Sequence, residues 1–206
     1  MNTSARLSAP TDRILARLSV TIFLAVLPSA TAGTIPLIRY GSPSELFRPM
    51  YVTAPTGDIN RLFIAEKSGT IKLLNLATGV LNPTPFLTIS DTDDQGHGGL
   101  QSIAFHPDFF VSGSNGYGKF YAYVTVDNGG QMIDGVVSPF SSHIRQYSVS
   151  DPMAAVANPV PTEVLSWVKP EDDHNGGWIG FNPKVTSTDE QYLYIRAERR
   201  RRNRGT

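Results

Sequence analysis

The sequence predicts an all-β fold, and three observations support that prediction. Short apolar or β-branched runs recur along the 206 residues, and clusters of glycine, proline, asparagine and aspartate separate them. Helix signals are nearly absent. Many short strands at this spacing are typical of a sandwich, a barrel or a propeller, and periodicity alone does not choose among the three.

The first 32 residues have the pattern of an export signal. Three arginines precede an apolar run at residues 18–27, Pro28 ends the run, and Ala30-Thr31-Ala32 forms a small-residue cleavage pattern. The run is too short to cross a bilayer comfortably, since a spanning helix needs about 20 apolar residues. We therefore expect cleavage after Ala32, a periplasmic or secreted protein, and no membrane span after cleavage. A retained N-terminal anchor is the alternative.

The strands are expected in regular succession along the chain. The clearest hairpin joins residues 62–67 to residues 70–75 through Ser68 and Gly69, a two-residue connection whose glycine can adopt positive φ. Further strands are expected at residues 50–53, 86–89, 101–105, 119–126, 143–149, 162–168, 178–181 and 191–195.

Charge is distributed unevenly along the chain, and cysteine is absent, so disulfides and thiolate chemistry are excluded. Residues 33–195 hold 9 Lys and Arg against 16 Asp and Glu, whereas six arginines crowd residues 196–204. Such a tail is one hypothesis for binding a polyanion, but no aromatic platform accompanies it, and we expect no nucleic-acid partner. Residues 91–94 have the acidic spacing of a calcium loop without the rest of that motif, which favours a solvated turn.

Two glycine-rich loops are the strongest candidates for a site. Gly96-His97-Gly98-Gly99 and Asp173-His174-Asn175-Gly176-Gly177 each place a glycine pair before a strand that ends in Phe, closely followed by Pro. In a propeller, loops at one end of the blades converge on a central channel, so these two loops would face each other. By contrast, His106 and Asp108 fit structural roles beside a turn.

The residues that follow these loops resemble a known family. Ala-Phe-His-Pro-Asp-Phe at residues 104–109, combined with His-Asn-Gly-Gly at residues 174–177, is similar to the soluble pyrroloquinoline-quinone-dependent glucose/sorbosone (aldose sugar) dehydrogenases. The resemblance extends over residues 48–195. It implies the N-terminal part of a six-bladed β-propeller that binds the quinone and Ca²⁺, oxidises the anomeric hydroxyl of aldoses and passes electrons to an external acceptor.

The same resemblance implies roles for three residues. His174 matches the general base, which suits imidazole because its ordinary pKa lies near neutrality. Asp173 would orient or tune that ring beside the cofactor. His97 occupies a position near the quinone where the family often has glutamine, and it could still donate a hydrogen bond to the cofactor. No residue of this chain is assigned to a metal.

The end of the sequence departs from the family. After Ile195 the family continues through a glycine-rich loop into further blades, whereas residues 196–206 are rich in arginine. We expect a propeller domain at residues 33–195 that is incomplete, with an aberrant tail produced by truncation or a frameshift. The full-length parent would be the enzyme and this fragment inactive. The alternative function is a non-catalytic propeller that binds a protein or carbohydrate ligand, as in the related hedgehog-interacting proteins.

Overall fold

The computed structural model describes residues 39–40, 45–133, 135–138, 140–168, 175–184 and 191–197. Within these ranges every regular element is a β-strand, so the predicted all-β class is confirmed. No helix in the described part of the chain has the length and hydropathy needed to cross a bilayer. The predicted export signal and most of the arginine-rich tail lie outside the described residues.

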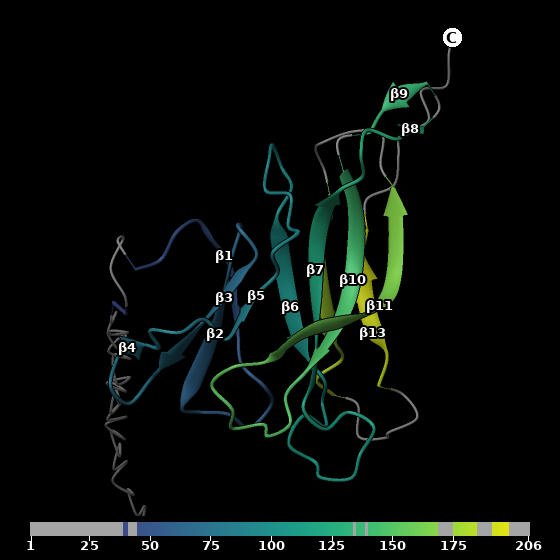
Figure 1. The fold of residues 1–206 in the computed structure, drawn as a ribbon. Coiled ribbons are helices and arrows are strands. Elements are labelled where there is room, and N and C mark those ends of the chain that lie inside the picture. The colour runs from purple at the N-terminus through teal and green to yellow at the C-terminus, as the bar shows by residue number, and fades with distance from the viewer. Residues whose placement is uncertain are drawn as a thin grey trace, which may run out of the picture. The chain divides into compact units, whose positions relative to one another are not determined.

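The described strands form a series of antiparallel sheets (Figure 1). The first sheet has the order β1-β2-β3-β4, with β5 also paired to β3, the second has the order β11-β10-β7-β6, the third pairs β12 with β13, and β8 pairs with β9 in a small hairpin. The strands are β1 (Pro49–Thr53), β2 (Arg61–Glu66), β3 (Thr70–Asn75), β4 (Val80–Leu81), β5 (Leu87–Thr88), β6 (Leu100–Phe105), β7 (Lys119–Asp127), β8 (Met132–Ile133), β9 (Val136–Val137), β10 (Phe140–Ser148), β11 (Asn158–Val168), β12 (Trp178–Phe181) and β13 (Leu193–Arg196).

Strand β6 lies between two cores because alternate side chains of a strand point to opposite faces. Ile103 and Phe105 pack into a large core with the first sheet, where Phe63 and Phe105 have ring centroids 4.6 Å apart. Ala104 points the other way, into a smaller core shared with β12, where Ile179 is fully buried. The first strands of three successive sheets, β1, β6 and β12, are thereby neighbours, as is typical of consecutive propeller blades.

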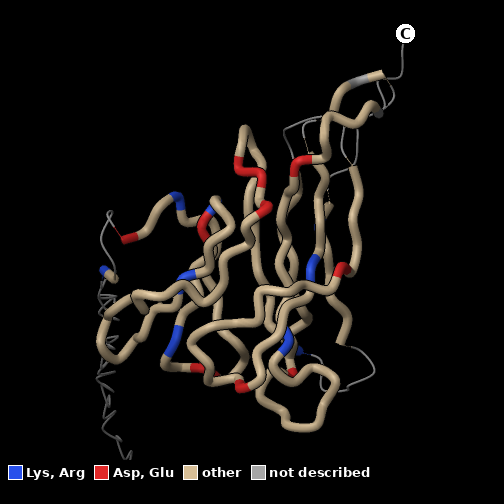
Figure 2. Tube along the Cα trace, viewed as in Figure 1, with Lys and Arg blue, Asp and Glu red and all other residues tan. Residues whose placement is uncertain are grey.

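Charged residues are sparse along the strands that form these cores. Figure 2 shows a trace that is mostly uncharged, with acidic and basic residues concentrated at strand ends and in loops. The sheets therefore pack through apolar and aromatic side chains, whose burial is the main source of stability for an all-β chain without disulfides.

The predicted hairpin is present, but its connection is one residue longer than expected. Strand β2 ends at Glu66, and Ala65 pairs with Ile71. Lys67 leaves the ladder because its backbone is bound elsewhere: its N–H donates to the Arg48 carbonyl (3.0 Å) and its carbonyl accepts from Leu100 N–H (3.0 Å). The connection between β2 and β3 is therefore Lys67–Gly69, and it ties the first sheet to the start of β6.

Strands β10 and β11 begin earlier than the sequence predicts, at Phe140 and Asn158. The early part of β11 contains Pro159 and Pro161, residues that disfavour a central strand. They are tolerated because β11 is an edge strand, which among the described strands pairs only with β10.

Candidate functional site

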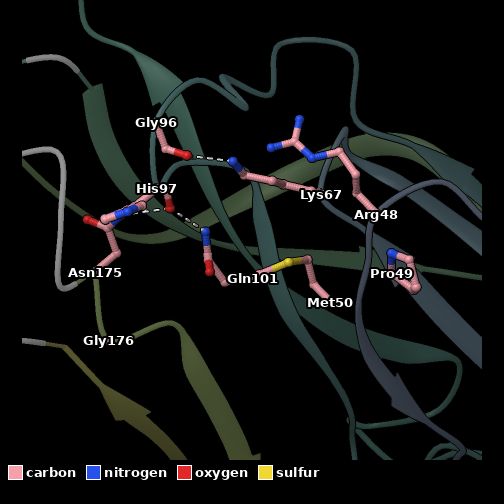
Figure 3. Close-up of a pocket in the computed structure, with 9 residues that line it drawn as sticks. All are labelled: Arg48, Pro49, Met50, Lys67, Gly96, His97, Gln101, Asn175 and Gly176. Atoms are coloured by element: carbon pink, nitrogen blue, oxygen red, sulfur yellow. Dashed lines mark hydrogen bonds between the residues drawn. The ribbon is translucent and has the colours of Figure 1, made fainter.

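A cavity of about 460 Å³ lies where β1, β6 and β12, the first strands of the three sheets, begin (Figure 3). It is lined from three directions: the residues that open β1, the turn after β2, and the two glycine loops that precede β6 and β12. Its lining consists of Arg48, Pro49, Met50, Lys67, Gly96, His97, Gln101, Asn175 and Gly176.

The two glycine loops meet at one backbone oxygen. The carbonyl of His97 accepts a hydrogen bond from Gln101 Nε2 (3.0 Å) and another from Asn175 Nδ2 (2.9 Å). Figure 3 shows both amides directed at this oxygen. The expectation that the loops face each other is therefore confirmed, although they are separated by 78 positions.

Buried hydroxyl groups of Tyr123 and Ser102 hold the second glycine loop in place. Tyr123, which is fully buried, donates its phenolic O–H to the Asn175 carbonyl (2.5 Å). Ser102 Oγ donates to the Gly177 carbonyl (2.6 Å) and accepts from Ile179 N–H (3.2 Å). Burial raises the pKa of Tyr123 above its ordinary value, so the phenol keeps the proton that it donates.

Glycine is required at positions 176 and 177 by conformation and by space. Their φ angles are +74° and +86°, in the left-handed region that glycine adopts without strain. A Cβ at Gly177 would lie 2.9 Å from Gln101 Cβ, and one at Gly176 would collide with the Arg196 carbonyl. The glycine pair therefore lets the backbone turn closely against β6 and β13.

Two cationic side chains line the cavity. Lys67 Nζ donates to the Gly96 carbonyl (2.6 Å), and Arg48 Nη1 pairs with Asp94 Oδ2 (3.2 Å). The pair with Asp94 is largely exposed, so it contributes little energy and Arg48 can exchange it for another anion. With two cations and no carboxylate among its described lining residues, the cavity favours an anionic ligand.

The structure describes His97 but not the other two predicted site residues. His97 lines the cavity with an exposed side chain. His174 and Asp173, which immediately precede Asn175 in the sequence, lie outside the described residues, so their roles stay predictions. Among the described residues, no group of three or more histidine, aspartate or glutamate side chains could hold a metal ion.

His106 has the structural role that the sequence suggested. Its Nδ1 accepts a hydrogen bond from the Asp108 N–H (3.1 Å), and its ring lies 5.3 Å from the Phe181 ring. Burial is the main cause that lowers the pKa of His106, which keeps the ring neutral and able to accept that bond.

The acidic turn at residues 91–94 is also structural. Asp91 forms a bidentate pair with Arg145, at 2.8 Å to each guanidinium nitrogen, and this bonding lowers the pKa of Asp91. Asp93 Oδ1 accepts from Gln95 N–H (3.0 Å) within the turn. The interpretation of this segment as a turn is confirmed. The ion pair with Arg145 also links the turn to β10, which the sequence did not predict.

Sequence reasoning missed Arg48, Lys67 and Gln101 as cavity residues. Arg48 and Lys67 are brought together by the hydrogen bond between their backbones, which depends on the pairing of β1 with β2. A lysine at the tip of a hairpin is common on any surface and carries no signal by itself. The adjacency of Gln101 to the Gly98-Gly99 pair was the available clue.

No protein-family profile matches the chain, and no curated protein is significantly similar to it in sequence. Its fold is similar to the crystal structure of a Thermus thermophilus protein that carries the provisional description oxidoreductase (glucose dehydrogenase). The two are 25% identical with a TM-score of 0.51, over 74% of this chain and 37% of that one. This chain thus spans little more than a third of the length of that protein.

The strands and this likeness together define an all-β fold that is consistent with part of a β-propeller. The number of blades stays a prediction. At the level that 25% identity supports, the chain has a coarse relationship to oxidoreductases of the glucose dehydrogenase type.

Proposed function

We propose that this chain carries part of the active site of a quinone-dependent oxidoreductase that oxidises the anomeric hydroxyl of aldose sugars. The cavity formed by the two glycine loops and the two cationic side chains is the observation that carries the proposal. Further support comes from the resemblance of residues 104–109 and 174–177 to sugar dehydrogenases and from the fold of the Thermus protein.

The lining residues fit a planar anionic cofactor. Pyrroloquinoline quinone is a flat tricarboxylate, and Arg48 and Lys67 would hold its carboxylates by charge-assisted hydrogen bonds. His97 would donate a further hydrogen bond from the preceding loop. When bound, this cofactor supplies the two-electron acceptor that no amino-acid side chain provides. The described residues do not offer a comparable set of carboxylates for Ca²⁺.

His174 is proposed as the general base, because it directly precedes Asn175, which forms part of the cavity wall. Its neutral imidazole would accept the proton of the anomeric hydroxyl, and Asp173 would stabilise the imidazolium that results. The binding partners are an aldose and an external electron acceptor. We also propose that the protein is exported to the periplasm or the medium, as its first 32 residues suggest.

Quinone binding can be tested separately from turnover. The chain is titrated with pyrroloquinoline quinone in equilibrium dialysis, and Lys67→Met and Arg48→Met are compared with Lys72→Met, a lysine on β3 that does not line the cavity. Loss of a charged hydrogen bond should weaken binding by about tenfold or more, since such bonds contribute ~1.5–3 kcal/mol. Equal affinity in all three variants would contradict the placement of the cofactor.

Turnover is then measured with quinone, Ca²⁺, an aldose and an artificial dye acceptor, on this chain and on a longer form if one is encoded. His174→Ala should remove dye reduction and leave quinone binding intact. Activity that survives this change would exclude His174 as the base. Tight quinone binding by the longer form, with no turnover on any aldose, would instead favour a non-catalytic binding protein.

A further inference from the structure

A second cavity, of about 430 Å³, is lined by the C-terminal parts of β1 and β6 and by the whole length of β12. Its wall includes aromatic rings from β1, β6 and β12, among them Tyr51, Phe105 and Trp178. Polar groups come from the end of β1 and the loop after it, the turn after β6, the residue after β12 and the segment before β13: Thr53, Thr56, Asp108, Asn182 and Gln191. It shares no described lining residue with the first cavity.

A partly exposed tryptophan, Trp178, forms part of the wall of this second cavity. Trp178 is 44% exposed although it belongs to β12, whose next residue, Ile179, is fully buried in the smaller core. Gly180 follows on the same face of the strand, because residues two apart share a face. The six-membered ring of the indole lies against Gly180, where a Cβ would be only 2.6 Å from Cζ2. The glycine thus makes room for an indole laid along its own strand.

Planar polar groups line the same cavity as this aromatic side chain. Gln191 Nε2 donates to Asp108 Oδ1 (2.9 Å), which joins the turn after β6 to the segment before β13. Asn182 Oδ1 accepts from Lys184 N–H (3.0 Å), which orients its side-chain amide at the end of β12. Carboxylate and amide groups that are fixed in this way offer both donors and acceptors to a ligand.

The charge of the second cavity differs from that of the first. Among its described lining residues, Asp108 carries the only formal charge, and no lysine or arginine is present. An anionic ligand would therefore be repelled, and a cationic ligand would find a single, already bonded carboxylate. A neutral ligand with an apolar face and several hydroxyls matches the indole and the polar rim together.

We propose that this second cavity is a saccharide-binding subsite in which Trp178 is the stacking platform and Asp108, Asn182 and Gln191 bind hydroxyls. The C–H face of a pyranose packs on the indole, and its equatorial hydroxyls exchange hydrogen bonds with the rim. The proposal does not rest on the oxidoreductase activity, since the two cavities are built from different residues.

Tryptophan fluorescence provides a direct test because the chain holds two tryptophans, Trp167 and Trp178. Trp167 packs edge-on against Tyr123 in the smaller core, with ring centroids 5.4 Å apart. In the variant Trp167→Phe, the emission reports Trp178 alone. Titration with glucose and with maltotriose should give a saturable change in that emission at millimolar sugar. No saturable change up to ~10 mM of either sugar would overturn the proposal.

Two further variants in the Trp167→Phe background locate the binding. Gly180→Ala displaces the indole and Gln191→Ala removes a rim amide, so each should weaken binding at least tenfold. Phe47→Ala is the matched control, because Phe47 is an exposed aromatic before β1 that does not line the cavity. Circular dichroism checks folding, and Gln191→Ala decides the outcome if Gly180→Ala does not fold. Unchanged affinity in Gln191→Ala would overturn the proposed rim.

The same titration separates this proposal from the oxidoreductase function. Lys67→Met should weaken quinone binding and leave the sugar titration unchanged. Saturable sugar binding supports the subsite whether or not this chain turns over, whereas turnover by a longer form without any response of Trp178 supports the enzyme and counts against the subsite.

Discussion

The hydroxyl of Tyr123 is expected to hold the second glycine loop against the sheet, and Tyr123→Phe removes that hydroxyl alone. Tyr123 is fully buried and donates to the Asn175 carbonyl at 2.5 Å, while Asn175 itself is only 6% exposed. The ring would keep its packing against Ile144 and Ile179 in the smaller core. The substitution therefore isolates one hydrogen bond between the core and the cavity wall.

The expected cost follows from burial. A buried acceptor that loses its donor costs about 1–3 kcal/mol, because water cannot replace the donor there. The contact from the Tyr123 hydroxyl to Ser142 Oγ is 3.4 Å and adds little. A loss of about 2 kcal/mol should lower Tm by roughly 4–8 °C, at ~2–4 °C per kcal/mol for a chain of this size.

Thermal unfolding followed by circular dichroism measures this loss, with Tyr121→Phe as the matched control. Tyr121 lies on the same strand and donates to Gln146 Oε1 (3.2 Å), but that bond is only partly buried, so water can replace the tyrosine. We expect the control to lose about 0.5 kcal/mol. If Tyr123→Phe lowers Tm no more than Tyr121→Phe does, the hydrogen bond to Asn175 does not stabilise the loop.

Three other expectations concern the turn at Asp91, the edge strand β11 and the N-terminus. Because bonding to Arg145 lowers the pKa of folded Asp91, its stabilisation is present above the ordinary value of 3.8 and is lost as pH falls below it. Asp91→Asn should reduce the dependence of the unfolding free energy on pH, measured by denaturant titration between pH 3 and 6. The expected reduction is only about 0.5–1 kcal/mol, because the carboxylate is 52% exposed. An unchanged pH profile would count against this role of Asp91. Replacing Pro159 and Pro161 with valine should increase aggregation measured by light scattering. Strand β11 exposes Val160 and Val164, and the prolines prevent another strand from pairing with this edge. Equal scattering would show that the prolines do not protect the edge. The exported protein should begin at Gly33 in N-terminal sequencing, and an intact Met1 would rule out cleavage.

Much of the strand pattern follows from local sequence, and the places where the predicted strands differ from the structure have physical causes. Strand β6 was predictable because its short, largely apolar run is bounded by glycines on one side and a proline turn on the other. The start of β10 was missed because Phe140-Ser141-Ser142 resembles a polar turn, yet Ser142 is fully buried, close to Tyr123. Whether serine belongs to a buried strand depends on a partner that is distant in the sequence.

The site was only partly predictable for a related reason. The glycine loops carry a local signal, since positive φ and close packing require glycine at particular positions. Arg48 and Lys67 carry no such local signal, because they are brought together by the pairing of strands β1 and β2. The resemblance implies roles for the histidines, whereas the charge of the cavity comes from Arg48 and Lys67, to which it assigns none.

The junction at His97 has a consequence for how this site can change. Gln101 and Asn175 both bind the backbone carbonyl of His97, and the imidazole takes no part in those two bonds. Every amino acid supplies the same carbonyl, so position 97 can be varied while the two loops stay connected. Ligand contacts at this position and the architecture of the loops are therefore independently adjustable, which makes residue 97 a suitable position for a saturation library aimed at cofactor preference.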